Sequence, residues 1–281
     1  MSLSGQVMNF DFQSYIQRRE ADPGRNVVRL QNYAYIEDIE HLRKLSERDI
    51  IQMGISLGLQ AWQIADGYRL RNRSRALGGM KSEERIAKNW LEVCYAFDHQ
   101  NLLLNIIPKQ KTFFEAYAGS EGAFFGISQA GCGLPNGAQK FVFGRGIGAL
   151  DNGHVPYLTL GRFFDAMTRG ILGKASQIPD TFLHWRLAAD ITEDRAGLLA
   201  CRDLSAAIFS IMHMQLDWES DEIMREIRRY HEKLDVDWGS RDIEKRVRAL
   251  EAFAGSSLYL PSGGRDINVV DEEVRKMYAV Y

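Results

Sequence analysis

The stretch of sequence that decides the fold is Phe141 to Leu160, FVFGRGIGALDNGHVPYLTL. It opens on an apolar run, continues through glycines on either side of Arg145, and closes on GHVPYLTL. A glycine inside a helix costs about 1 kcal/mol relative to alanine. We therefore expect a helix formed by this stretch to be bent, shortened or partly unwound around Gly144 and Gly146.

The residue order of this stretch resembles the active-site helix of gluzincin metallopeptidases of the HtpX and CAAX prenyl protease type. In that family a hydrophobic run leads into HELGH, and a few residues later into a segment similar to the GHVPYLTL seen here. The positions of the family's first His, its Glu and its second His are taken here by Arg145, Gly146 and Ala149.

Other segments extend the resemblance in the expected order. Asp190 to Asp203, DITEDRAGLLACRD, is similar to the family's second metal helix, and Arg246 to Tyr259, RVRALEAFAGSSLY, to its closing segment. Upstream, Phe113 to Cys132 is similar to the strand, polar turn and strand that border the substrate cleft. The resemblance covers roughly residues 100–262. It implies a zincin-like fold with a small sheet among helices.

The resemblance also identifies the degenerate positions of the site. Asp190 replaces the Glu that is the family's third zinc ligand, Glu193 replaces an Ala, and Asp194 matches the family's supporting Asp. Two histidines four residues apart on a helix grip zinc, and the adjacent Glu takes a proton from the bound water. Arginine has no lone pair for a metal, and Gly146 and Ala149 offer no donor atom. We therefore expect no catalytic residue and no metal ligand.

Arg145 itself has a predicted role. If the zincin-like fold is kept, its guanidinium enters the space where zinc would lie and faces Asp190 and Asp194. A partly buried carboxylate needs a cation or hydrogen-bond donors, and arginine supplies two parallel hydrogen bonds. We predict an ion pair between Arg145 and Asp190 that replaces the metal as the tie between two helices.

Two alternatives stay open. A residual polar site could be formed by His154, His184, Glu193, Asp194 and Arg195, and a zinc peptidase with non-standard ligands would draw on it together with Asp190. His184 and Asp190 are six residues apart and share a helix face poorly.

A dinucleotide-binding protein is the other alternative. Gly144, Gly146 and Ala149 fit G-x-G-x-x-A, with the strand-like KFVF before them and Asp165 after them. The elements expected after this stretch are helix after helix, however, and not alternating strands and helices.

Composition narrows the class of protein. The chain has 281 residues, of which 45% are hydrophobic and 26% charged, and its net charge of −2 argues against nucleic acid as a partner. No apolar run is long enough to predict a transmembrane segment. The odd number of widely spaced cysteines, Cys94, Cys132 and Cys201, suits reduced thiols in the cytoplasm.

The sequence as a whole predicts an α+β protein that is mostly helical. We divide it into an N-terminal helical region at 1–99, a degenerate metallopeptidase-like domain at 100–262 and a C-terminal helix or tail at 263–281. The expected function is a catalytically inactive scaffold, adaptor or regulatory subunit. Such a protein would hold a protein partner in the former substrate groove, alone or as part of an oligomer or larger assembly, and needs no cofactor.

Overall fold

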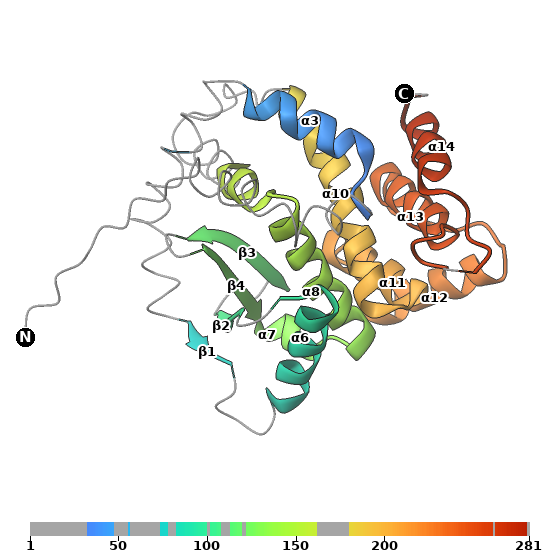
Figure 1. Ribbon diagram of the computed structural model, residues 1–281. Helices are drawn as coiled ribbons and strands as arrows, with labels where there is room; N and C mark the ends of the chain where they lie inside the picture. The colour runs from blue at the N-terminus through green and yellow to red at the C-terminus, as the bar shows by residue number, and fades with distance from the viewer. Residues whose placement is uncertain are drawn as a thin grey trace, which may run out of the picture.

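The computed structural model describes residues 33–47, 56, 74–77, 83–99, 102–107, 113–119, 122–161, 180–260 and 262–279. Its elements, in chain order, are α3 (Ile36–Ser46), β1 (Arg75–Ala76), α6 (Glu84–Ala96), β2 (Leu104–Ile107), β3 (Phe114–Gly119), β4 (Gly122–Ser128), α7 (Gln129–Gly133), α8 (Asn136–Asp151), α10 (Asp180–Cys201), α11 (Leu204–Gln215), α12 (Ser220–His231), α13 (Arg241–Ala254) and α14 (Ile267–Ala279). The described protein is mostly helical with one small mixed sheet, as expected for the α+β class (Figure 1).

The sheet has four strands in the order β1-β2-β4-β3. β3 and β4 form an antiparallel hairpin in which Phe114 pairs with Ile127 and Tyr117 with Phe124. β2 runs parallel to β4, and β1 is antiparallel to β2. The two strands predicted within residues 113–132 are confirmed, and the side chain of Ser128 caps the short helix α7 that follows β4.

Helices α8 and α10 form the centre of the molecule and pack along each other (Figure 1). Small residues line their contact: a Cβ added to Gly144 would lie 2.5 Å from the Cβ of Ala200, and one added to Gly148 would lie 2.5 Å from the Cβ of Ala196. The expected shortening or unwinding was wrong, because α8 is one continuous helix from Asn136 to Asp151. Close packing against α10 offsets the helix propensity that the glycines lose.

The C-terminal helices begin where the sequence places capping residues. Asp203 accepts a hydrogen bond from the backbone N–H of Ala206 at the start of α11, and Ser240 accepts one from Ile243 at the start of α13. The charged helix α12 turns only a narrow apolar stripe inward, with Ile223 and Ile227 buried. These helices agree with the mostly helical content predicted from the sequence.

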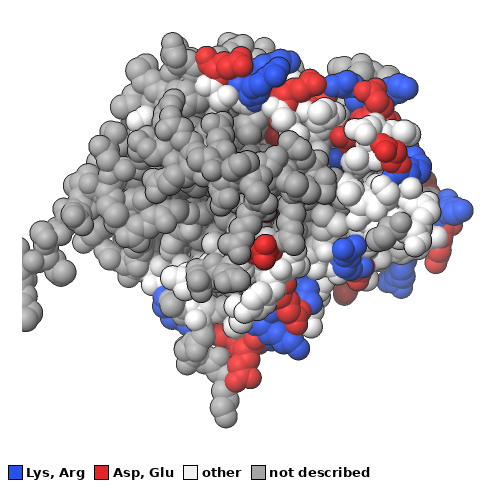
Figure 2. All heavy atoms as spheres, in the orientation of Figure 1, with Lys and Arg blue, Asp and Glu red and all other residues white. Residues whose placement is uncertain are grey.

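Elements from the predicted N-terminal region pack onto the central pair. Trp90 of α6 lies 5.2 Å, ring centroid to centroid, from both Phe125 of β4 and Phe143 of α8. α3 lies against α10, and Arg275 of α14 pairs with Glu37 of α3 at 2.7 Å. Figure 2 shows acidic and basic side chains interspersed on the described surface around these helices. Among the described helices, none combines the length and apolarity needed to cross a bilayer.

Candidate functional site

Arg145 projects from the middle of α8 toward α10 and is almost wholly buried. Its guanidinium donates to Asp190 Oδ1 at 2.7 Å and to Glu193 Oε2 at 2.8 Å, and it also contacts Asp194 Oδ1. The ion pair between Arg145 and Asp190 predicted from the sequence is therefore present. It is one of three that the same guanidinium makes with a single helix.

Two further arginines, not anticipated from the sequence, complete the arrangement. Arg246 of α13 holds the Asp194 carboxylate with two hydrogen bonds of 2.7 Å each. Arg186, one turn before Asp190 on α10, donates to Asp190 at 2.8 Å and to Glu193 at 3.2 Å. Each of the three carboxylates on α10 thus faces at least two cationic side chains.

His154 connects this group to α3. Its Nδ1 lies 3.2 Å from Glu193 Oε1 and its Nε2 lies 2.9 Å from Asp38 Oδ2, with both His154 and Asp38 buried. Burial alone would lower the pKa of His154, but the two carboxylates outweigh it and raise this pKa to about 9. The imidazole is therefore protonated at neutral pH and acts as a cation.

We call the resulting set the buried charge network. Its cationic members are Arg145, Arg186, Arg246 and His154, and its anionic members are Asp38, Asp190, Glu193 and Asp194. The four positive and four negative charges cancel, which is the condition under which so many ionised groups tolerate removal from water.

The pKa directions agree with this balance. Burial acts to raise the pKa of both Asp190 and Glu193, yet Arg186 and the other nearby cations lower it below the ordinary range. Burial also opposes the charge on Arg145, but Asp194, Asp190 and Glu193 raise its pKa. Asp190, Glu193 and Arg145 therefore keep their charges across the neutral range.

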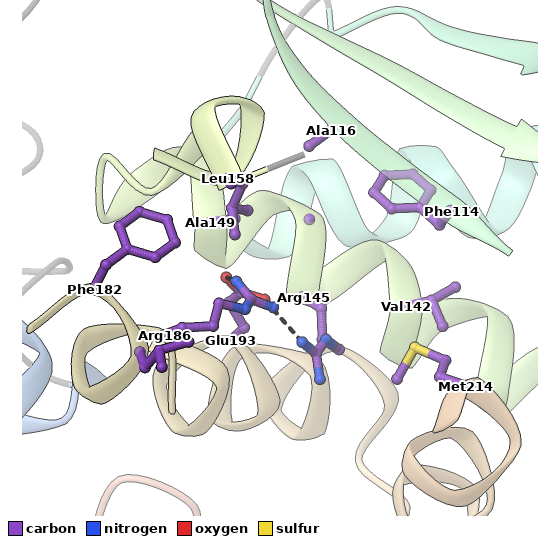
Figure 3. A pocket seen from close by; sticks show the side chains of 13 residues that line it. Phe114, Ala116, Val142, Arg145, Ala149, Leu158, Phe182, Arg186, Glu193 and Met214 are labelled. Carbon is purple, nitrogen blue, oxygen red and sulfur yellow. Dashed lines mark hydrogen bonds and ion pairs between the residues drawn. The ribbon is translucent and has the colours of Figure 1, made fainter. Parts of the chain in front are cut away.

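A cavity of about 400 Å³ opens beside the buried charge network (Figure 3). Its polar wall is formed by Arg145, Arg186 and Glu193, which meet between α8 and α10. Its other lining side chains are mainly apolar and include Phe114, Val142, Ala149, Leu158, Phe182, Leu183 and Met214. The cavity lies between β3 and the two central helices, the place where the resemblance puts the substrate groove.

Arg145, Gly146 and Ala149, the three degenerate positions, each have another structural role. A Cβ added to Gly146 would lie 2.0 Å from the ring of Phe114, so this ring fills the space that a Glu side chain would enter. Ala149 is buried and lines the cavity wall. Zinc does not fit these residues, because the described carboxylates that contact Arg145 are also engaged by Arg186 or Arg246 and a guanidinium offers no lone pair.

The structure brings together part of the residual polar site. His154, Glu193 and Asp194 belong to the buried charge network, but His184 lies elsewhere, with its ring centroid 6.5 Å from that of His41. Arg195 instead pairs with Asp271 of α14 at 2.6 Å. Grouping all five residues in one site was therefore wrong. Among the described residues, no cluster of His, Cys, Asp or Glu is arranged to hold a metal ion.

The glycines of the dinucleotide-binding alternative do not lie between a strand and the start of a helix. KFVF lies inside α8 and is not a strand, so Gly144 and Gly146 are in mid-helix, away from the N–H groups of a helix start. Asp165, the acidic residue of that alternative, lies outside the described residues.

The sequence analysis missed Asp38, Arg186 and Arg246. Arg186 stands four residues before Asp190, a spacing that places opposite charges on one helix face and could have indicated it. Arg246 opens the RVRAL segment already singled out by the resemblance. Asp38 has no local signal, because its role depends on how α3 packs across α10.

No protein-family model, curated protein or solved structure matches this chain. The relation to gluzincin metallopeptidases therefore stays a prediction based on the motifs quoted above.

Proposed function

We propose that this chain is a catalytically inactive, metallopeptidase-like protein that binds a protein partner. The observation that carries the proposal is the environment of Arg145, whose guanidinium contacts Asp190, Glu193 and Asp194. Asp190 is the residue that the resemblance aligns with a zinc ligand. In place of a metal that joins two helices, the protein has an arginine that joins the same two helices.

Electrostatics supports the inactive assignment. A divalent cation beside Asp190 would have to displace Arg145 and Arg186 from that carboxylate or sit next to their charges. Buried cations in contact repel each other strongly because the surrounding dielectric constant is low. The buried charge network is already neutral, so an added metal would leave uncompensated positive charge in the site.

The cavity beside the buried charge network supports the binding half of the proposal. Ligand-binding cavities are typically about 300–1,000 Å³, mostly apolar, with a few polar groups that fix orientation. This one has that character, with a volume of about 400 Å³ and guanidinium groups on one wall. We propose that an apolar side chain of an extended partner segment enters it between β3 and α8.

The inactive half is tested by metal content. Untagged protein purified without chelator should contain close to zero zinc by elemental mass spectrometry, and its unfolding temperature should be unchanged by EDTA. About one zinc per chain, together with chelator-sensitive cleavage of a protein substrate, would establish a working peptidase and overturn the proposal.

The binding half is tested by selecting peptides from a random display library on the wild-type chain. Leu183 lines the cavity and is 51% exposed, so Leu183→Glu alters the cavity rim at little cost to the fold. Leu234 is 54% exposed and outside the cavity lining, which makes Leu234→Glu the matched control.

Selected peptides should bind Leu183→Glu at least about tenfold more weakly than wild type, a difference of about 1.4 kcal/mol. They should bind Leu234→Glu as they bind wild type, measured by fluorescence polarisation. Equal affinity for all three proteins, or no enriched peptide at all, would contradict binding in this cavity.

A further inference from the structure

One wall of the cavity beside the buried charge network continues into a cluster of aromatic rings. Phe114 of β3 lines this cavity, and its ring centroid lies 5.4 Å from that of Phe143 and 5.9 Å from that of Phe125. Phe114 is only partly buried, so part of its surface faces the cavity. Aromatic rings attract one another in stacked and edge-to-face arrangements at such distances. A ring that entered the cavity beside Phe114 would extend the cluster.

The other apolar walls also suit a ring. Phe182 of α10 and Met214 of α11 line the same cavity, and a thioether sulfur makes favourable contacts with aromatic rings. Part of the remaining lining is formed by Ala116 and Ala149, whose short side chains leave the interior open (Figure 3). The apolar lining therefore offers ring and sulfur contacts around a space of about 400 Å³.

Arg186 gives the polar wall a flat cationic surface. It follows Phe182 by one helical turn on α10, and both side chains line the cavity (Figure 3). Its Nη1 donates to Glu193 at 3.2 Å and its Nη2 to Asp190 at 2.8 Å, and these hydrogen bonds use the edge of the planar guanidinium. Among the described residues, no aromatic ring stacks on its faces, and the side chain is 33% exposed. A face of the guanidinium is therefore left for a ligand.

The class of side chain that fits this wall follows from the chemistry of Arg186. A carboxylate is disfavoured, because Asp190 and Glu193 already lie against the guanidinium and would repel it. An aliphatic side chain would remove the exposed part of the guanidinium from water without offsetting the loss. An aromatic ring presents its negative π face to the guanidinium and stabilises the charge while it excludes water. The wall therefore favours a neutral aromatic ring over both.

We propose that the partner side chain that enters this cavity is aromatic and that its ring stacks on the guanidinium of Arg186. The inference rests on the proposed function, because it concerns the same cavity and the same partner segment. Arg186 thereby acts as a specificity-determining residue. It selects a segment with Phe, Tyr or Trp at the inserted position over one with Leu, Ile or Met.

The probes are the peptides enriched by display on the wild-type chain. The inserted position is the one whose change to alanine weakens binding most on wild type and least on Leu183→Glu, and we expect an aromatic residue there. The tightest peptide is resynthesised with phenylalanine and with cyclohexylalanine at this position, because cyclohexylalanine keeps the apolar bulk and lacks the π face. In fluorescence polarisation the cyclohexylalanine peptide should bind wild type about fivefold more weakly than the phenylalanine peptide.

Arg186→Gln assigns that difference to the guanidinium. Glutamine keeps a hydrogen-bond donor but no positive charge, while Asp190 and Glu193 keep their ion pairs with Arg145. In this variant the two peptides should bind within about twofold of each other. Arg248→Gln makes the same change at a site that is 59% exposed and outside the cavity lining, and should keep the full difference. The comparison on wild type needs no variant, so it tests the inference even if Arg186→Gln unfolds.

Three results would overturn the inference and leave the proposed function standing. The enriched peptides could share an aliphatic residue at the inserted position, the two resynthesised peptides could bind wild type equally, or their difference could persist in Arg186→Gln. Failure to find any peptide that distinguishes wild type from Leu183→Glu would instead remove the proposed function and this inference together.

Discussion

Replacement of Arg145 by alanine is expected to destabilise the protein by about 3 kcal/mol. Removing one partner of a buried ion pair typically costs about 3–5 kcal/mol because it leaves an uncompensated charge. The lower end applies here, since every carboxylate that loses Arg145 keeps another cation: Asp194 keeps Arg246, and both Asp190 and Glu193 keep Arg186. The loss corresponds to a fall in unfolding temperature of roughly 6–12 °C for a chain of this size.

The assay is urea unfolding followed by circular dichroism, with wild type and three variants compared at one pH. Arg145→Met keeps most of the side-chain volume, so a loss similar to that of Arg145→Ala would assign the effect to charge and not to packing. Arg248→Ala is the matched control, because Arg248 is 59% exposed and pairs with Glu244 at the surface, where less than about 1 kcal/mol is expected. Wild-type stability for Arg145→Met would refute the ion-pair reasoning.

Three other predictions concern protonation, packing and thiol chemistry. The pKa of His154 is about 9 in the folded protein against an ordinary 6.5, so its stabilisation is complete below about pH 6.5 and is lost as the pH rises through 9. Urea midpoints should fall by the equivalent of about 3 kcal/mol over that window, and His154→Gln should lack this dependence. Gly144→Ala should lower stability by about 1–3 kcal/mol in the same assay because its Cβ collides with α10, whereas Gly133→Ala, with open space around the added Cβ, should be close to neutral. Burial raises the pKa of the Cys94 and Cys201 thiols to about 12, so Ellman's reagent should modify them far more slowly in the folded protein than in urea; equal rates would contradict their burial.

The sequence was enough to predict the mostly helical α+β class, and the resemblance of residues 113–132 was enough to predict the strands β3 and β4. The ion pair between Arg145 and Asp190 was predicted from the resemblance. In the family that this chain resembles, the two segments that correspond to these residues are helices that face each other across the metal site. Arg246 was visible in the sequence but had no assigned partner. Its contact with Asp194 follows from the packing of α13 against α10, which no local pattern encodes.

The errors have the same physical origin. Intrinsic propensity predicted a shortened or unwound helix at Gly144 and Gly146, yet α8 is continuous there and packs closely against Ala200 and Phe114. His184 and Arg195 were grouped with His154 as a possible residual polar site, although His184 lies next to His41 and Arg195 pairs with Asp271. Most of the predicted N-terminal helical region, 1–99, lies outside the described residues.

The small-residue contact between α8 and α10 affects how variation in this protein should be interpreted. Gly144, Gly148, Ala196, Gly197 and Ala200 carry no chemistry, but each allows the two backbones to approach closely. In a saturation mutagenesis experiment these positions should tolerate substitution as poorly as a catalytic motif does. A Gly-rich segment that tolerates few substitutions can therefore reflect the close approach of two helices. A search for enzymes based on mutational sensitivity alone would mistake such a segment for an active site.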